Sequence, residues 1–339
     1  MSEKKFDYWQ FFADDARRTG SELYARLAEG VRDDEALRAM TANARPGQPP
    51  ANLLFGAVHF LLMHGAQHPL REFYADLGGT DSGDAFPAFR DFCHTHRDAL
   101  LALIDTRVTN TNEVGRSAIL HPGFRVAAEA PLYLIEIGPS AGLNMIWDSY
   151  GIRYRKEGRT AAVIAPDAPL VIDCELKGEK IPPTGQTPKI AGRVGLELNP
   201  VDLAHRDDRD WLRALMWPDQ ISRLDRLDKA IALFEKSKPE IRAGDALALL
   251  PEAMADAPQD AAICVYHTIA VYQFSTQMKE TLDDILTVAG LRRPVTRLSF
   301  EMEELHVCEL KLIRYRDGTK QERVLATAHP HGTWLEWTA

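Results

Sequence analysis

The most constraining feature of the sequence is an apolar run that ends in a cluster of glycines. Residues Pro131 to Gly138 form a short apolar stretch with an acid near its end, which is typical of a buried parallel β-strand. Gly138 permits a tight turn, and Gly142 permits a ligand to approach the backbone closely. Ser140 is a suitable N-cap for a helix running to about Tyr150, whose N-terminus would attract a carboxylate or a phosphate. The alternative is a tightly packed strand-to-helix turn without a ligand.

After this turn, apolar runs alternate with helical patterns. Further strands are expected at 194–198, 240–245, 261–267 and 295–300, and helices at 210–217, 221–236 and 276–288. Two long alternating strands then flank the turn Arg316 to Thr319, which is a hairpin signal. Strand–helix alternation predicts an α/β fold with a doubly wound, mostly parallel, Rossmann-like sheet. The proline-containing segment 151–192 is expected to be an insertion, either a lid or a surface excursion.

The first part of the chain has a different pattern. Trp9, Phe12 and Ala16 recur at helical spacing, and Asn52 to His64 is a strongly apolar helical stretch. No clear strand pattern occurs before residue 129. We therefore expect an all-helical N-terminal domain over residues 1–128, packed over the ligand face of a second domain over residues 129–339.

Three acids follow three successive predicted strands. Glu136 lies at the end of the first, Glu197 at the end of the second and Asp245 at the end of the third. Ligands of open α/β sheets bind at the carboxyl ends of the strands. At that edge, Glu197 can accept hydrogen bonds from both hydroxyls of a ribose, and Asp245 lies where an adenine amino group is expected. A single acid of this kind is usually a solvated loop residue, but three in succession favour a binding site.

These motifs resemble those of a bacterial family of unknown function. Its members share a glycine signature close to EIGPSAGLNMIWDSY, here residues 136–150, and a TNEVGR motif, here residues 111–116. The resemblance covers nearly the whole chain, and the second half is similar to class I S-adenosylmethionine-dependent methyltransferases. Two departures are the long gap before the second strand and the short segment 301–306, which leaves little room for a crossover helix. The resemblance implies S-adenosylmethionine as cofactor, bound by Glu136, Gly138, Ser140, Gly142, Asn144, Glu197, Asp245, Ala246 and Tyr266.

A second polar cluster precedes the first strand. Asn112, Glu113 and Arg116 suit a polar ligand, because an arginine can bind a carboxylate through two hydrogen bonds. The alternative is an interdomain salt bridge with a capping asparagine. His267, after the fourth strand, is a candidate general base, and the alternative is a core histidine bonded to backbone. We expect Asn112 to contact the substrate, and Glu113, Arg116 and His267 to serve catalysis in a pocket between the domains.

Composition narrows the classes of partner. Forty-nine acids against 40 bases give a formal charge of −9, which disfavours binding to nucleic acid. No apolar run approaches the about 20 residues that a bilayer crossing requires. Four widely spaced cysteines indicate reduced thiols in a cytoplasmic protein. The histidines form no HExxH or similar ligand set, so no metal is predicted.

The leading interpretation is an S-adenosylmethionine-dependent methyltransferase that acts on an oxygen or nitrogen of a small molecule. Such an enzyme works chiefly by holding donor and acceptor in line, so few catalytic side chains are needed. A non-catalytic protein that binds the cofactor or a related nucleoside is the alternative. Ser140 and the absence of a Tyr-x-x-x-Lys motif disfavour an NAD-linked oxidoreductase. No pattern identifies the acceptor or the oligomeric state.

Overall fold

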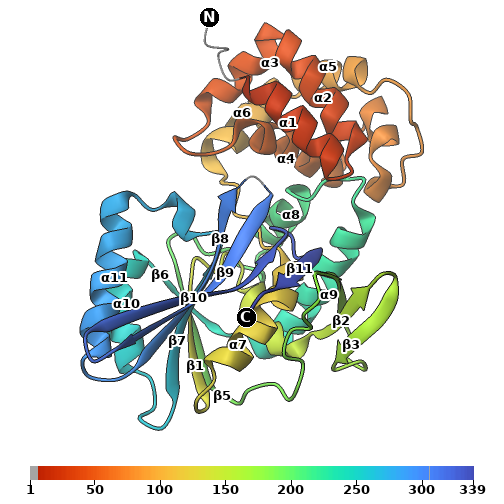
Figure 1. The fold of residues 1–339 in the computed structure, drawn as a ribbon. Helices are drawn as coiled ribbons and strands as arrows, with labels where there is room; N and C mark the ends of the chain where they lie inside the picture. The colour runs from red at the N-terminus through yellow and green to blue at the C-terminus, as the bar shows by residue number, and fades with distance from the viewer. Residues whose placement is uncertain (1–6, 305) are drawn as a thin grey trace, which may run out of the picture. The chain divides into compact units, whose positions relative to one another are not determined.

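The structure is a computed structural model that describes residues 7–304 and 306–339. The chain divides into two compact units. Unit 1 comprises Met1–Thr111 and Asp202–Leu227, and unit 2 comprises Asn112–Val201 and Asp228–Ala339. The chain therefore leaves unit 1 at Thr111, returns to it for 26 residues, and re-enters unit 2 within a helix. Figure 1 labels the helices and strands of both units.

Unit 1 is built from helices over the residues that the structure describes. Several begin at a polar N-cap: the carboxylates of Asp7 and Asp34 accept N–H bonds at the starts of α1 and α3, and the Ser21 hydroxyl does so at α2. Proline at the first position begins α4. The elements are α1 (Tyr8–Arg18), α2 (Glu22–Asp33), α3 (Glu35–Met40), η1 (Thr41–Asn43), α4 (Pro50–Met63), η2 (Pro69–Phe73), η3 (Ala75–Leu77), α5 (Phe86–Thr95), α6 (Arg97–Thr106), α8 (Arg206–Ala214) and the first part of α9 (Ile221–Ser237).

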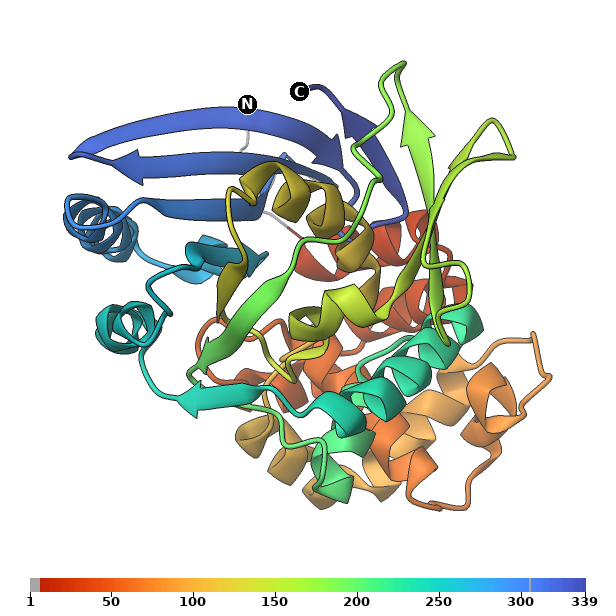
Figure 2. The same ribbon diagram turned by 90° about the horizontal axis from the view of Figure 1, so that it is seen from below.

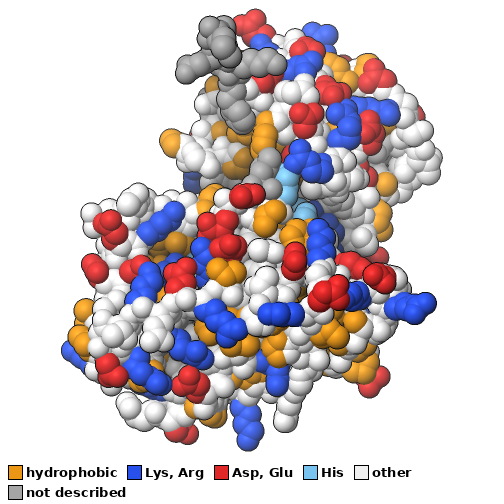
Figure 3. All heavy atoms as spheres, in the orientation of Figure 1, with side chains coloured by type: hydrophobic (Ala, Val, Ile, Leu, Met, Phe, Trp, Pro, Cys, Tyr) orange, Lys and Arg blue, Asp and Glu red, His pale blue; other side chains and the backbone are white. Residues whose placement is uncertain are grey.

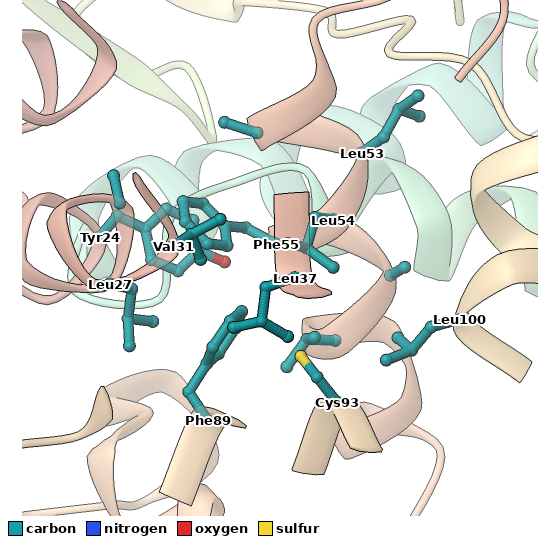
Figure 4. Packing of buried hydrophobic residues seen from close by; sticks show 14 of the residues in the cluster. Tyr24, Leu27, Val31, Leu37, Leu53, Leu54, Phe55, Phe89, Cys93 and Leu100 are labelled. Atoms are coloured by element: carbon teal, nitrogen blue, oxygen red, sulfur yellow. The ribbon is translucent and has the colours of Figure 1, made fainter. Parts of the chain in front are cut away.

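Helix α4 is the centre of the core of unit 1. Ten of its side chains or backbone positions are buried, which explains its nearly uniform apolar sequence. Phe55 packs edge to face on Phe12 and Phe89, with ring centroids 5.5 Å apart in both pairs, and it also meets Tyr24 (Figure 4). The buried His59 is bonded to Asp76 and to a backbone carbonyl. His59 therefore has a structural role within unit 1.

Unit 2 contains one eleven-stranded sheet (Figure 1). Its strand order is β3-β2-β4-β11-β10-β9-β8-β7-β1-β5-β6. The strands are β1 (Leu132–Ile137), β2 (Gly151–Lys156), β3 (Arg159–Ile164), β4 (Val171–Lys177), β5 (Ile190–Glu197), β6 (Glu240–Ala243), β7 (Ala262–Thr268), β8 (Val295–Glu304), β9 (Val307–Arg316), β10 (Thr319–Ala328) and β11 (Trp334–Trp337). The helical elements are η4 (Val114–Arg116), α7 (Ser117–Ala127), η5 (Leu143–Ser149), the rest of α9, α10 (Ala246–Ala255), η6 (Val271–Gln273) and α11 (Thr276–Gly290).

The prediction of a doubly wound, Rossmann-like sheet is wrong. The sheet is mixed: β2–β3, β8–β9, β9–β10 and β10–β11 are antiparallel pairs. The segment expected to be an insertion supplies β2, β3, β4 and the start of β5, and β4 pairs in parallel with β11. Sequence patterns missed the pairing of β4 with β11 because it joins segments about 160 residues apart. The short connection after β8 leads by a hairpin into β9, as the lack of room for a crossover helix had indicated.

Helices pack on two faces of the sheet (Figure 2). One face, covered by α10 and α11, buries Ile135, Val265 and Val295 with Leu250 and Leu286. The other carries α7: a Cβ at its Gly123 would lie 3.1 Å from Leu310 and 3.4 Å from Leu298. Alternate side chains of a strand point to opposite faces, so the face of each polar residue follows from its position. We call these the α10–α11 face and the α7 face.

Two further observations concern the surface. None of the helices that the structure describes combines the length and the apolar character needed to cross a bilayer. On the side drawn in Figure 3, basic and acidic side chains are interspersed over the molecule.

Candidate functional site

The candidate site lies at the carboxyl ends of β1, β5, β6 and β7 in unit 2. These neighbouring strands are all parallel, in the order β6-β5-β1-β7. The turn after β1 has three residues with positive φ: Gly138 at 70°, Ser140 at 56° and Gly142 at 81°. A serine in this left-handed region is uncommon, and such conformations concentrate at functional sites.

The helix expected after this turn is not an α-helix. Residues Leu143–Ser149 form a 3-10 element, η5, with non-helical angles at Ile146. Gly142 precedes it in a left-handed conformation, and Ser140 does not cap it. The prediction of a helix that is capped by Ser140 and runs to about Tyr150 is therefore wrong, and the binding of a carboxylate or phosphate at this turn stays a prediction. The helix does not form because Gly138, Ser140 and Gly142 have left-handed backbone angles, which an α-helix does not accommodate.

The glycines of the turn have packing roles. A Cβ at Gly138 would lie 2.7 Å from the Cβ of Ala270, which belongs to the loop after β7. At Gly142 a Cβ would lie 2.9 Å from both Ile241 and Phe234. These contacts bring the turn against its protein neighbours, so a side chain at either position would displace them.

Glu197 fastens the turn to β5. Its Oε2 accepts the backbone N–H of Ser140 at 2.8 Å, and its Oε1 accepts that of Asn199 at 3.0 Å. The carbonyl of Glu197 accepts the N–H of Gly244 at 2.9 Å, which brings the end of β6 alongside. Asp245 is exposed and caps α10 through the N–H of Leu247, directly before Ala246. The turn after β1, the end of β5 and the end of β6 therefore meet at the carboxyl ends of the strands.

Glu136 is a buried acid on the α7 face, with 1% of its surface exposed. The hydroxyl of Tyr266 on β7 donates to its Oε2 at 2.9 Å, and this is the one hydrogen bond that the described residues give its side chain. Burial raises the pKa of Glu136 to about 8, while the Tyr266 bond and the cation of Arg116 oppose the shift. A carboxyl in this setting holds its proton near neutral pH.

The TNEVGR segment lies against the same turns. Asn112 accepts the N–H of Leu143 at 2.8 Å through its side chain, and the Glu113 carbonyl accepts the Asn144 amide at 3.3 Å. The Glu113 carboxylate accepts the N–H of Gly115 at 3.0 Å. The segment therefore holds η5 through side-chain-to-backbone bonds.

Arg116 connects this segment to two more loops. Its Nε donates to the carbonyl of Pro330 at 2.9 Å, and one terminal nitrogen donates to the carbonyl of Thr268 at 2.8 Å. Gly332 presses on the same place: a Cβ there would lie 2.1 Å from the carbonyl oxygen of Gly115. The loop between β10 and β11 thus packs directly on the TNEVGR segment.

His267 points to the opposite face from its neighbour Tyr266. Its Nε2 accepts the Nε–H of Arg297 at 2.9 Å, so the ring proton lies on Nδ1, which donates to Glu301 at 2.5 Å. Burial and the Arg297 cation lower the pKa of His267. Asp283 in turn accepts from Arg297 at 3.0 Å. The histidine is therefore a neutral member of a buried polar network on the α10–α11 face.

The predicted site residues separate into two groups. The structure brings together those of the β1 turn, Glu197, the end of β6, Tyr266 and the TNEVGR segment, through the bonds above. It puts His267 on the other face, with both ring nitrogens bonded, so its role as base stays a prediction without geometric support. Sequence reasoning missed Thr268, Tyr272, Glu301 and Gly332. An acid at the end of the fifth predicted strand, Glu301, was the available signal, because it follows the same rule as Glu136.

Comparison with known proteins assigns the chain to a family. Residues 7–337 match the family described as "Uncharacterized protein conserved in bacteria (DUF2332)", and the chain belongs to that family. The predicted membership of a bacterial family of unknown function is thus confirmed over nearly the whole chain. No curated protein and no solved structure gives a significant match.

Proposed function

We propose that unit 2 binds S-adenosylmethionine at the carboxyl ends of β1, β5 and β6 and methylates a small molecule. The observation that carries the proposal is Glu197. Its two carboxylate oxygens are each oriented by a backbone N–H, of Ser140 and of Asn199, at the edge where parallel strands present ligands. A carboxylate oxygen accepts more than one hydrogen bond, so this group retains the capacity to accept the hydroxyls of a ribose.

The surrounding residues fit a nucleoside with an amino acid part. Ser140 and Gly138 supply a turn of left-handed residues, and Asp245 supplies an exposed carboxylate beside Glu197. Glu136 supplies a second, buried carboxyl. When bound, S-adenosylmethionine supplies an electrophilic methyl group. The residues named here would hold and orient it, and orientation is the main requirement of such a transfer.

A small-molecule acceptor fits the charge of the protein better than a nucleic acid. The formal charge is −9, and on the side drawn in Figure 3 the basic side chains do not form a continuous patch. Oxygen or nitrogen acceptors remain the proposed class.

A specific observation favours a second candidate, a non-catalytic protein that binds the same ligand. The side chains that we expected to serve catalysis, Glu113, Arg116 and His267, each make hydrogen bonds that support the fold. Groups with such partners are suited to shape a site. This candidate shares the binding step with the first and differs in turnover alone.

The experiment has two steps. Thermal-shift titrations with S-adenosylmethionine, S-adenosylhomocysteine and NAD test the ligand class, since a ligand at about 100 times its Kd adds roughly 2.7 kcal/mol. We expect stabilisation by both sulfur compounds and none by NAD. Equal shifts with NAD, or none with the sulfur compounds, would contradict the proposal. Radiolabelled methyl transfer to a bacterial small-molecule extract then separates the enzyme from the non-catalytic binder.

A further inference from the structure

The loop after β7, residues 269–272, is fastened by one carboxylate. Oε1 of Glu301 accepts the N–H groups of Ala270 and Val271, both at 3.1 Å, and Oε2 accepts that of Tyr272 at 3.1 Å. With the Nδ1–H of His267, four donors converge on this one side chain. These bonds hold the pKa of Glu301 below its usual value although burial opposes the shift. The carboxylate is therefore ionised and fixed.

The same loop contains a strained residue. Ile269 has a φ of 51°, and a β-branched side chain rarely adopts this left-handed conformation. Its N–H donates to the carbonyl of Phe300 at 2.8 Å. Strain of this kind persists only where surrounding bonds determine the conformation, and Glu301 provides those bonds.

The loop lies directly on the candidate site. Ala270 is the residue that a Cβ at Gly138 would meet. Thr268, at the start of the loop, accepts a hydrogen bond from Arg116. One bonded segment thus joins the turn after β1, the TNEVGR segment and Glu301.

Tyr272 is the exposed member of this loop. Its backbone is held by Glu301, yet 53% of its surface is exposed. Burial of part of the side chain and the charge of Glu301 raise the pKa of its hydroxyl, and the Arg116 cation lowers it. The loop that carries this ring contacts the candidate site through Ala270 and through Thr268, which Arg116 bonds. An aromatic ring on a fixed backbone offers contact area at a low cost in conformational entropy.

We propose that Glu301 is a positioning residue of the ligand site: it fixes the loop 269–272 so that the ring of Tyr272 contacts the bound ligand. The inference rests on the proposed function, because the ligand is the one proposed above. Glu301 acts through the loop and does not touch the ligand. Hydrogen bonds continue from His267 through Arg297 to Asp283 on the α10–α11 face. Tyr315 and Lys320 also donate to Asp283, both at 2.6 Å.

The test uses the full chain and S-adenosylhomocysteine as the probe. Glu301→Gln replaces a carboxylate oxygen with an amide that cannot accept all the loop N–H groups. Glu303→Gln is the matched control, since Glu303 lies two residues along the same strand and pairs with Lys311 at the surface. Tyr272→Ala removes an exposed ring and leaves its backbone bond, so it is expected to fold even if Glu301→Gln does not. Calorimetry gives the Kd, and hydrogen exchange gives the protection of the amides of residues 270–272.

We expect Glu301→Gln to lose amide protection in the loop and to bind the probe about tenfold more weakly, which corresponds to 1.4 kcal/mol. Tyr272→Ala should weaken binding by a similar factor with unchanged Tm and unchanged loop protection, and Glu303→Gln should match the wild type in every readout. Wild-type binding with an unchanged Kd in both Glu301→Gln and Tyr272→Ala overturns this inference alone. Failure of the wild type to bind the probe overturns the proposed function as well.

Discussion

Glu136 and Glu301 lie at the same end of the sheet but on opposite faces, and their pKa values are shifted in opposite directions. Glu136, on the α7 face, has the Tyr266 hydroxyl as its donor, and its pKa rises to about 8. Glu301, on the α10–α11 face, has three backbone N–H groups and His267, and its pKa falls. Both are largely buried, so burial alone does not decide whether a carboxyl is ionised. The hydrogen-bond donors directed at the carboxyl and the charges near it also decide.

This difference distinguishes a carboxylate that holds a loop in place from a carboxyl that is available to a ligand. A carboxylate with its acceptor sites filled, such as Glu301, stabilises a loop. A carboxyl with few donors, such as Glu136, retains acceptor capacity and stores an unfavourable desolvation energy, which a ligand with donors would relieve. Glu197 is intermediate, with two N–H donors and 8% of its surface exposed. The α7 face is therefore the side on which we expect polar groups of the ligand.

The largest expected effect concerns Glu136→Gln. Because the pKa of Glu136 is raised from 4.5 to about 8, the folded state binds its proton more tightly than the unfolded state. The wild type therefore loses stability as the pH rises from about 4.5 to about 8, and glutamine has no proton to lose. Urea unfolding should show the variant gaining about 4 kcal/mol relative to the wild type between pH 4 and pH 9. If the free energy of unfolding depended on pH in the same way in the wild type and in Glu136→Gln, the raised pKa of Glu136 would be contradicted.

Glu301→Ala should lower the free energy of unfolding, in contrast to Glu136→Gln. Removing the carboxylate leaves three loop N–H groups and His267 without their acceptor, so the free energy of unfolding at pH 7 should fall by about 3 kcal/mol. Because the folded pKa of Glu301 is lowered, this stabilisation is present above the unfolded value of 4.5 and is lost as the pH falls through the folded value. Glu303→Ala is the control and should change stability by less than about 0.5 kcal/mol. Equal losses in the two variants would show that the loop bonds contribute nothing specific.

The smallest effect is expected at the contact between Gly332 and Gly115. Gly332→Ala puts a methyl group against the Gly115 carbonyl and also suffers from a φ of 70°. Gly318→Ala has the same backbone problem, with a φ of 72°, but meets a flexible leucine side chain at 3.2 Å. Chemical unfolding should give a loss about 2 kcal/mol larger for Gly332→Ala. A difference near zero would mean that the loop between β10 and β11 can shift to accept the methyl group without a loss of stability.

The sequence predicted the local elements of the site better than its surroundings. The strands that end near Glu136 and Glu197 occur where the apolar runs indicated, because buried parallel strands have a distinctive composition. The pairing of β4 with β11 was not predictable, since it depends on contacts between segments far apart in the sequence. The left-handed φ of Ser140 was also not predictable, because serine ordinarily avoids that region.

The face on which His267 lies could have been inferred from the sequence. Tyr266 and His267 are adjacent in a strand, so their side chains must point to opposite faces, and both cannot line one site on the same face. The alternation favours Tyr266, which bonds to Glu136, and assigns His267 to the other side. The contact between His267 and Glu301 could not be inferred in this way, because the rule does not give the register between two strands.

The central claim is tested most directly by calorimetric titration of S-adenosylhomocysteine into three proteins: the wild type, Glu197→Gln and Glu240→Gln. Glu240 begins β6 at the opposite, amino end of the parallel strands and pairs with Arg242, so it controls for the loss of a glutamate. We expect the wild type and Glu240→Gln to bind with equal Kd. Glu197→Gln should stay folded, although its amide keeps only one of the two oxygens that accept a backbone N–H, and should bind at least tenfold more weakly. Equal affinity in all three proteins, or no binding to any of them, would contradict it.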